Sequence, residues 1–300
     1  MGPLWHPKSA IDTELIRSCY IQVQSIGGRE VKRLTIVMAL ASLTVCLVFQ
    51  TVKAEDTIAI IGTGDLGDSL GVRLAELGYT VVYGSRTPDS DRAKAVVAMT
   101  GHDAYVTTQR EAARLGDIVF LPIGWPAMET AAQSLGDLDG KIVVDPSVPW
   151  GQGEDGYPEV SVSPSSAELI QQWNPGAKVV KAFGTMGSMI IDHPDLLGGP
   201  VTIPVASDDR AAKERVAQLV HEMGLDPVDF GPLRMARSIE ALAIIYMIPL
   251  LRHKDEEWEF YFRRNADWAC KWEDDWSDPL FDADQLAVMP ETQDPPKPCP

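Results

Sequence analysis

The sequence predicts an α/β protein: a Rossmann-type, doubly wound parallel sheet with a small C-terminal helical subdomain. Three observations predict this fold. Apolar β-branched runs alternate with helical patterns from residue 57 onward, a glycine-rich turn joins the first run to the first helix, and a second run follows within the span of a βαβ unit. A chain of 300 residues has room for one large domain, or for one domain plus a smaller one.

The first βαβ unit occupies residues 57–83. Residues 57–61 are continuously apolar, as expected of a strand that is buried on both faces of a parallel sheet. The glycine-rich segment 62–67 follows at once, leucine then recurs at helical spacing, and Gly78 is expected to end the helix. The β-branched run 79–83 is the predicted second strand.

The alternation of strands and helices continues along the chain. Further helices are expected over residues 92–99, 109–115, 127–135, from 165 with a capping box to Glu168, 210–223 and 234–251, the last ended or kinked by Pro249. Further strands are expected over residues 104–107, 117–122, 141–145, 178–183, 201–206 and 227–230. Residues 146–164 are rich in Gly, Pro and Ser and show no periodicity. Because this stretch leaves the carboxyl end of a strand, we expect a structureless loop that borders a ligand.

The glycine-rich segment has the pattern G-x-G-x-x-G, which in this context predicts a dinucleotide-binding loop. Gly62 permits the tight turn, Gly64 lets the backbone approach a pyrophosphate, and Gly67 lets the helix pack close to the sheet. The amides around Asp65 and Leu66 then face the phosphates, helped by the helix dipole. A glycine turn with a purely structural role is the alternative.

The end of the second strand distinguishes NADP from NAD. An NAD enzyme usually places Asp or Glu about 20 residues after the first glycine, where the acid holds the ribose 2′-hydroxyl. This chain has Ser85 and Arg86 at that point and no acid. An acid would repel a 2′-phosphate, whereas Arg86 can clamp it and Ser85 can donate to it. The sequence therefore favours NADP(H), with a surface arginine in a loop as the alternative.

Residues 1–54 do not read like the rest of the chain. The basic pair at 32–33, the apolar run 34–49 and a small residue before Glu55 form the pattern of a secretory signal peptide. The run is shorter than a membrane-spanning helix requires. We therefore expect export to the periplasm, with a membrane anchor through an uncleaved leader or a cytoplasmic location as alternatives. Translation from Val31 or Met38 would explain the upstream extension.

Composition excludes some partners and leaves others open. The net charge of −17 argues against nucleic acid, since its phosphates would be repelled. No metal site is expected, because the histidines lack ligand spacing. Cys270 and Cys299 remain beyond the leader, as a disulfide or as two free thiols. The apolar segment 239–251 predicts a homodimer interface.

These observations predict four parts of the chain. They are a leader (residues 1–54), an NADP-binding Rossmann domain (55–206), a C-terminal α/β-to-helical subdomain (207–272) and a disordered acidic tail (273–300).

Several motifs recur together in an order that resembles a known family. They are Gly62–Gly67, Gly84-Ser85-Arg86, Pro122-Ile123-Gly124-Trp125, Val179–Phe183, and Gly231-Pro232-Leu233 with Arg237 and Glu240. Together they resemble the NADP oxidoreductases that use the deazaflavin coenzyme F420. The resemblance runs from about residue 57 to residue 251, and extends to the reductase domain of the six-transmembrane metalloreductases.

The resemblance implies direct hydride transfer between nicotinamide and a flavin-like ring, with coenzyme F420 or another flavin as co-substrate. The protein then positions the two rings and excludes water, and no catalytic side chain is assigned. On this basis Thr63, Gly64, Asp65 and Leu66 would contact the phosphates, and Ser85 and Arg86 would hold the 2′-phosphate. Pro122, Ile123, Trp125, Ala182 and Phe183 would line the nicotinamide pocket, and the loop 146–164 would border the second ring.

The chain departs from the family pattern at three places. Gly184 stands where many relatives have Asn, the loop 88–90 lacks an extra basic residue near the 2′-phosphate, and the leader has no counterpart in the cytosolic members. Two other functions therefore stay open. One is a dinucleotide-binding redox sensor or subunit without turnover, and the other is reduction of a small imine or ketone, which would need a proton donor near the nicotinamide.

Overall fold

The computed structural model describes residues 56–249 and 251, and their core is a six-stranded parallel sheet of order β3-β2-β1-β4-β5-β8. The strands are β1 (Thr57–Ile61), β2 (Thr80–Ser85), β3 (Tyr105–Thr108), β4 (Ile118–Phe120), β5 (Ile142–Asp145) and β8 (Lys178–Lys181). The chain builds outward from β1 to β3, then crosses back to β4 on the other side of β1. This reversal confirms the predicted doubly wound sheet.

Helices cover both faces of the sheet. One face carries α3 (Asp65–Glu76), α4 (Asp91–Thr100), α8 (Ser188–Asp192) and α9 (Arg210–Glu222). The other carries α5 (Gln109–Leu115), α6 (Trp125–Ser134), α7 (Ser166–Trp173) and α10 (Ala236–Ile248), which follows the 3-10 turn η2 (Leu233–Met235). The predicted helices are present with ends that differ by a few residues. The five-residue α8 is not predicted, because it is too short to show a period.

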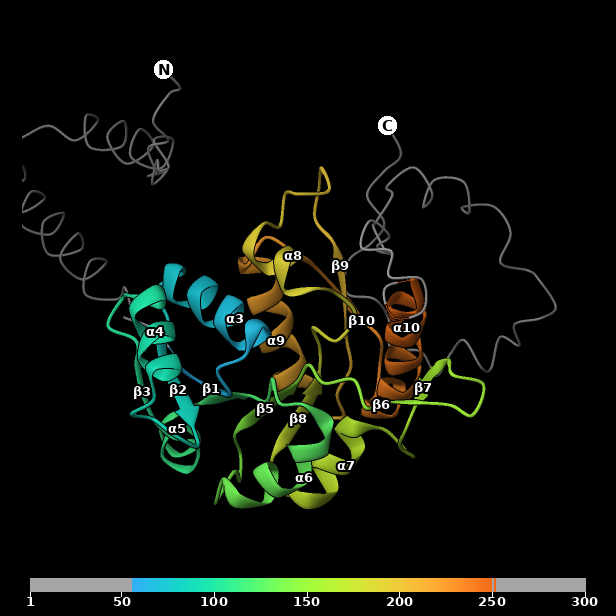
Figure 1. Ribbon diagram of the computed structural model, residues 1–300, viewed down its shortest axis with the longest axis horizontal. Coiled ribbons are helices and arrows are strands. Elements are labelled where there is room, and N and C mark those ends of the chain that lie inside the picture. Colours follow the sequence, from blue (N-terminus) through green and yellow to red (C-terminus); the bar gives the residue numbers. More distant parts are fainter. Residues whose placement is uncertain (1–55, 250, 252–300) are drawn as a thin grey trace, which may run out of the picture. The chain divides into compact units, whose positions relative to one another are not determined.

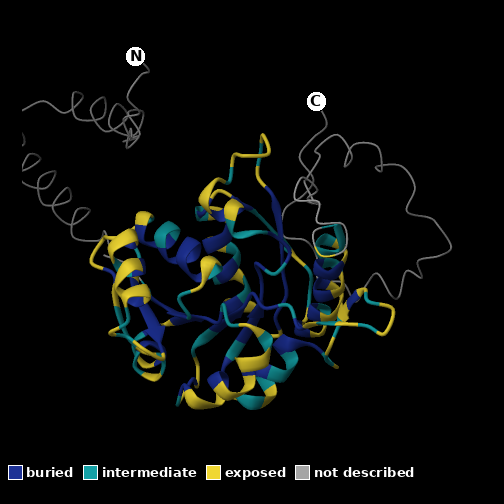
Figure 2. Ribbon diagram, in the orientation of Figure 1, coloured by how far each residue is buried: buried dark blue, intermediate teal, exposed yellow. Residues whose placement is uncertain are grey.

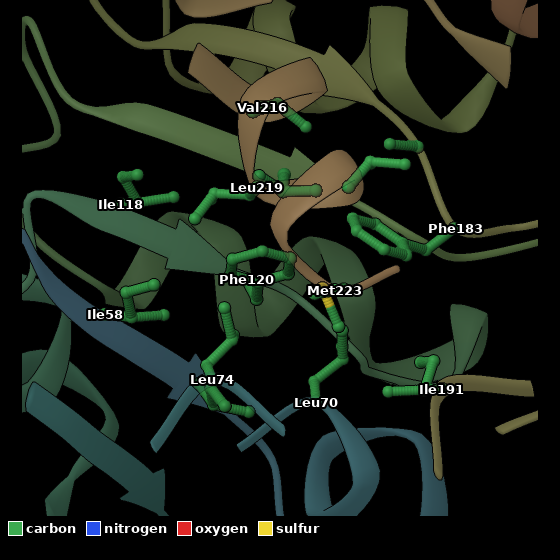
Figure 3. Close-up of a cluster of buried hydrophobic side chains, with 14 of the residues drawn as sticks. Ile58, Leu70, Leu74, Ile118, Phe120, Phe183, Ile191, Val216, Leu219 and Met223 are labelled. Carbon is green, nitrogen blue, oxygen red and sulfur yellow. The ribbon is translucent and has the colours of Figure 1, made fainter. Parts of the chain in front are cut away.

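Strand β1 shows why the apolar runs are continuous. Ile58 and Ile60 pack into the hydrophobic cluster on one face of the sheet, and Ala59 and Ile61 pack into the cluster on the other. Successive side chains of a strand point to opposite faces, so a strand with helices on both sides needs an apolar residue at every position. Figure 2 shows the central strands as buried along their length, and Figure 3 shows the first of the two clusters.

A second, two-stranded parallel sheet joins β9 (Thr202–Val205) to β10 (Asp226–Asp229), with α9 between them in sequence. An antiparallel bridge between Lys181 and Ala206 attaches it to the end of β8. Val216 and Leu219 of α9 pack in the same cluster as Ile58 of β1. The predicted boundary between residues 206 and 207 thus falls between the paired strands β9 and β10.

The prediction of a structureless loop over residues 146–164 is wrong in part. The segment contains an antiparallel hairpin of β6 (Trp150–Gln152) and β7 (Pro158–Val160), which lies beside α10 (Figure 1). Its strands have three residues each, too few to show the alternation by which a strand is recognised. The tip of the hairpin is exposed (Figure 2).

Helix termini follow the expected chemistry. The hydroxyl of Ser165 caps α7 by accepting from the amide of Glu168, 3.2 Å away, as predicted. The carboxylate of Glu168 accepts from the Ser165 hydroxyl and forms a bidentate ion pair with Arg237, so the capping residues also join α7 to α10. Gly78 takes a positive φ of 96° directly after the C-cap of α3, and α10 ends at Pro249, both as predicted.

Several predictions concern residues outside the described part of the chain. They are the leader over residues 1–54, the pairing of Cys270 with Cys299, and the acidic tail, and they stay predictions. In residues 56–249 and 251, no helix has both the length and the apolar character needed to cross a membrane.

Substitution of Gly71 in α3 would test how closely this helix packs on the sheet. Alanine would favour the helix by roughly 1 kcal/mol, but a β-carbon at position 71 would overlap the hydroxyl of Tyr83 and lie 2.5 Å from its Cζ. Tyr83 is fully buried and its hydroxyl is 2.7 Å from that of Thr100, so the ring has nowhere to move. We expect Gly71→Ala to lower the free energy of unfolding by about 1–3 kcal/mol in chemical denaturation.

The matched control is Gly124→Ala, where a β-carbon would meet nothing within 4 Å. This variant should unfold at nearly the denaturant concentration of the unaltered chain. Equal stability of the two variants would contradict the steric argument.

Candidate functional site

The candidate site lies where the sheet reverses its direction, between β1 and β4. The loops after these two strands must diverge to opposite faces, and the gap between them is where ligands bind in open α/β sheets. The amide of Gly62 donates to the carbonyl of Gly84 at 3.0 Å, which fixes the glycine loop beside the end of β2. A β-carbon at Gly62 would lie 3.0 Å from the carbonyl oxygen of Pro122, so the loop after β4 closes in from the other side.

The three glycine positions of the loop differ in whether the protein itself requires glycine there. Gly62 has a φ of +136°, a conformation that L side chains rarely adopt. A β-carbon at Gly67 would lie 2.8 Å from the carbonyl oxygen of Gly62, so a side chain there would push the helix off the loop. At Gly64 a β-carbon would meet nothing within 4 Å. The protein therefore does not require glycine at position 64, and the open space fits a pyrophosphate against the backbone.

The N-terminus of α3 is left free to bind an anion. The side chains of Ser90, Thr108, Ser165 and Asp209 cap the N-termini of α4, α5, α7 and α9. Among the described residues, helix α3 begins after Gly64 with no side-chain cap, as α6 and α8 also do, so the amides of its first turn have no such partner. Uncapped amides at the positive end of the helix dipole suit the phosphates of a dinucleotide.

Ser85 and Arg86 end β2 at the edge of this loop. Ser85 is buried, and its hydroxyl accepts from the amide of Thr87 at 3.1 Å. That bond leaves the hydroxyl hydrogen free to donate. Arg86 is exposed, and in the described part of the chain its guanidinium has neither a hydrogen bond nor an ion pair. The pair is thus a donor and an available cation where the 2′-phosphate is predicted to bind.

The predicted nicotinamide-lining residues are only partly brought together. Pro122 and Ile123 are half-buried at the end of β4, next to the glycine loop. The ring of Trp125 stacks on Trp173 of α7, with ring centroids 5.9 Å apart and planes inclined by 24°. This contact holds Trp125 between α6 and α7, and its contact with a nicotinamide stays a prediction.

Ala182 and Phe183 lie deeper than a pocket lining would. Both are buried, and the Phe183 ring packs 5.9 Å from that of Phe120 in the cluster that contains Met223 (Figure 3). Phe183 also has a φ of +64°, a strained conformation for a residue with a side chain. Burial of the ring offsets this strain, and a ligand at this point would meet backbone rather than the face of Phe183.

Gly184 has a packing role that its departure from the family pattern did not reveal. A β-carbon at this position would lie 3.3 Å from the carbonyl oxygen of Pro146 and 3.6 Å from the Cγ2 of Val148. The segment after β8 therefore runs directly against the start of the loop that precedes the hairpin. The segment that follows the predicted nicotinamide-lining residues is thus in contact with the loop predicted to border the second ring.

Comparison with known proteins identifies the family. Residues 57–149 match the family described as NADP oxidoreductase, coenzyme F420-dependent. Over 202 residues the chain is 30% identical to the F420-dependent NADP reductase of Methanothermobacter thermautotrophicus, and the match covers 62% of this chain and 85% of that reductase. This chain belongs to the F420-dependent NADP oxidoreductase family.

Two further similarities extend this result. A solved structure from Arthrobacter sp. FB24, described as an F420-dependent NADP-reductase, is 27% identical with a TM-score of 0.62, covering 70% of this chain and all of that one. Metalloreductase STEAP3 of Rattus norvegicus is 29% identical over 192 residues, which is 64% of this chain and 37% of STEAP3. The chain thus spans little more than a third of the length of that metalloreductase.

A buried ionic network lies under the carboxyl edge of the sheet in this family member. Lys181 ends β8 and pairs in register with Asp145 at the end of β5. Its Nζ lies 2.9 Å from Asp145 Oδ2, 3.1 Å from Glu240 Oε1 and 2.8 Å from the Ser166 hydroxyl. It also donates to the backbone carbonyl of Ser147. The three ionisable side chains are completely buried.

The network explains how the loop after β5 is positioned. Asp145 Oδ1 accepts from the amide and the hydroxyl of Ser147, and Lys181 holds the carbonyl of the same residue. In the sequence, only the motifs shared with the family point to Lys181 and Glu240. Nothing in the periodicity could have indicated their pairing, because Glu240 lies in a mostly apolar helix 59 residues after Lys181.

Glu240 gives the network a pH dependence. Burial raises the pKa of its carboxyl above 4.5, against the opposing pull of Lys181, and in the described structure its Oε2 is buried without a hydrogen-bond partner. A raised pKa means that the folded chain holds this proton more tightly than the unfolded chain. The protonated carboxyl therefore stabilises the fold at low pH, and this contribution is lost as the pH rises through the folded pKa.

We expect Glu240→Gln to remove this dependence. As the pH falls from neutral toward 4.5, the free energy of unfolding of the unaltered chain should rise relative to that of the variant. The measurement is urea denaturation of both proteins across that pH range, with Glu214→Gln of the exposed face of α9 as control. A constant difference between the unaltered chain and Glu240→Gln would contradict the assignment.

Proposed function

We propose that this chain transfers a hydride between NADP(H) and a flavin-like two-electron acceptor such as coenzyme F420. The observation that carries the proposal is the uncapped N-terminus of α3, with open space at Gly64, next to Ser85 and to Arg86, which has no partner among the described residues. These groups are complementary to a pyrophosphate and to a 2′-phosphate respectively. Family membership and the relatives named as F420-dependent NADP reductases support the hydride transfer.

The second ring would be placed by the loop from Pro146 to the hairpin. This loop starts at the carboxyl edge of the sheet and contacts Gly184, and the network of Lys181 and Asp145 fixes its first turn. In hydride transfer the cofactor supplies the chemistry, and the protein contributes the relative position of the two rings. A rigid loop at this point is what that role requires.

A binding role without turnover is the second candidate. The observation that favours it is the burial of Phe183 and the stacking of Trp125 on Trp173, which leave fewer side chains to enclose a nicotinamide ring. Both candidates require NADP(H) binding, so binding alone does not separate them.

Turnover assays of the full chain separate the two candidates. We expect NADPH to be oxidised only when coenzyme F420 or FMN is present, and deuterium carried on the transferred position of NADPH to appear in reduced coenzyme F420. Absorbance follows NADPH and mass spectrometry follows the deuterium. Tight NADPH binding without oxidation by either acceptor would contradict the enzymatic function and leave the binding role.

We also infer a homodimer that uses α10. Ile245 in this helix is 54% exposed, and Leu251, which lies three residues beyond its last residue, is 39% exposed. Apolar side chains of this size are costly to leave in water. Light scattering of the full chain should give the mass of a dimer, and Ile245→Glu should give that of a monomer. A monomer before substitution would exclude this interface.

A further inference from the structure

Arg92 lies across the glycine loop, although it belongs to a different element. It stands in the first turn of α4, and its Nε donates to the carbonyl of Thr63 at 2.9 Å. Its Nη2 forms an ion pair with the carboxylate of Asp68 and lies 3.7 Å from Asp65 Oδ1. The guanidinium is therefore held on the rim of the loop by two residues of the first turn of α3 and by the loop backbone.

One edge of this guanidinium is still available. Among the described residues, Nη1 of Arg92 has no hydrogen-bond partner, and the side chain is 55% exposed. Arginine presents five N–H donors in a planar fork, so it can hold a carboxylate with one edge and a phosphate with another. The bonds to Thr63 and Asp68 would orient the free edge rather than compete with a ligand.

The position of Arg92 matches the expected 2′-phosphate site. The bond from the Gly62 amide to the Gly84 carbonyl places the glycine loop beside the end of β2, one residue before Ser85. Thr63 follows Gly62, so the guanidinium bound to its carbonyl lies at the part of the glycine loop that adjoins the end of β2. The end of β2 and the first turn of α4 thus each place an arginine close to the glycine loop.

The carboxylates around the glycine loop make a second cation favourable for phosphate binding. A phosphate monoester carries roughly two negative charges at neutral pH, and Arg86 offsets only one. Asp65 and Asp68 add negative charge on α3, and Asp89 and Asp91 add more in the segment that leads into α4. Without Arg92, these carboxylates would repel a phosphate at short range.

We propose that Arg92 is the second cation that recognises the adenosine 2′-phosphate, and so determines the preference for NADP(H) over NAD(H). It would replace, from α4, the basic residue that the loop 88–90 lacks. The inference rests on the proposed NADP(H) binding and names a specificity-determining residue of that site. Asp68 acts as a positioning residue, because its carboxylate holds the guanidinium in place.

The test uses two fragments of the cofactor with the full chain. Adenosine 2′,5′-bisphosphate carries the 2′-phosphate, and 5′-AMP does not. We expect Arg92→Ala to weaken binding of the bisphosphate by about tenfold or more, the equivalent of one charge-assisted hydrogen bond, and to leave 5′-AMP within about twofold. Isothermal titration calorimetry measures both. Arg86→Ala should act in the same direction, and Arg210→Ala, on the exposed face of α9, should change neither.

Equal weakening of both fragments by Arg92→Ala would overturn the assignment, since Arg92 would then only hold the loop. If removal of the arginine leaves the buried Asp68 uncompensated and the chain unstable, the double variant Arg92→Ala with Asp68→Asn removes that charge as well. The same selective loss of the bisphosphate is expected of it, and unchanged selectivity would overturn the proposal. Failure of the unaltered chain to bind NADPH would instead overturn the proposed function itself.

Discussion

The buried pair of Lys181 and Asp145 holds together the edge of the sheet on which the site is built. Moving charges out of water is costly, and the cost is offset only when every charge is paired and hydrogen-bonded. Here Asp145 accepts from Ser147, Ser166 and Lys181, and Glu240 adds a second carboxylate from α10. The network connects β5, β8, α7 and α10. Its hydrogen bonds orient the backbone at Ser147, which apolar contacts, having no preferred direction, could not do.

The cofactor end of the site depends on a different constraint. Parallel strands deliver their loops to one edge, and the reversal of strand order at β1 and β4 separates those loops. Among the described residues, the helix that starts in this gap has no side-chain cap for its first amides, so the topology favours phosphate binding there. The acids in the first turn of α3 oppose it, and the ion pair between Arg92 and Asp68 is the local compensation.

The region predicted to hold the nicotinamide and the second ring follows the family motifs less closely. Phe183 is buried, and Trp125 stacks on Trp173. Both side chains therefore pack within the protein, although the family motifs place them in the nicotinamide pocket. Contact of Gly184 with Pro146 makes the backbone itself the boundary of that region.

The sequence alone determined the layered fold. A sheet with helices on both faces requires continuously apolar strands, and helix caps and glycine turns depend on residues only a few positions apart. It also located the glycine loop and the pair Ser85-Arg86, whose roles depend on position along one βαβ unit. Only the tertiary structure decided which distant side chains meet. Arg92 reaches Thr63 across 29 residues and Lys181 reaches Glu240 across 59, and such contacts leave no local period in the chain. The hairpin within 146–164 was hidden for a related reason, since three-residue strands are specified by their partner and not by their own pattern.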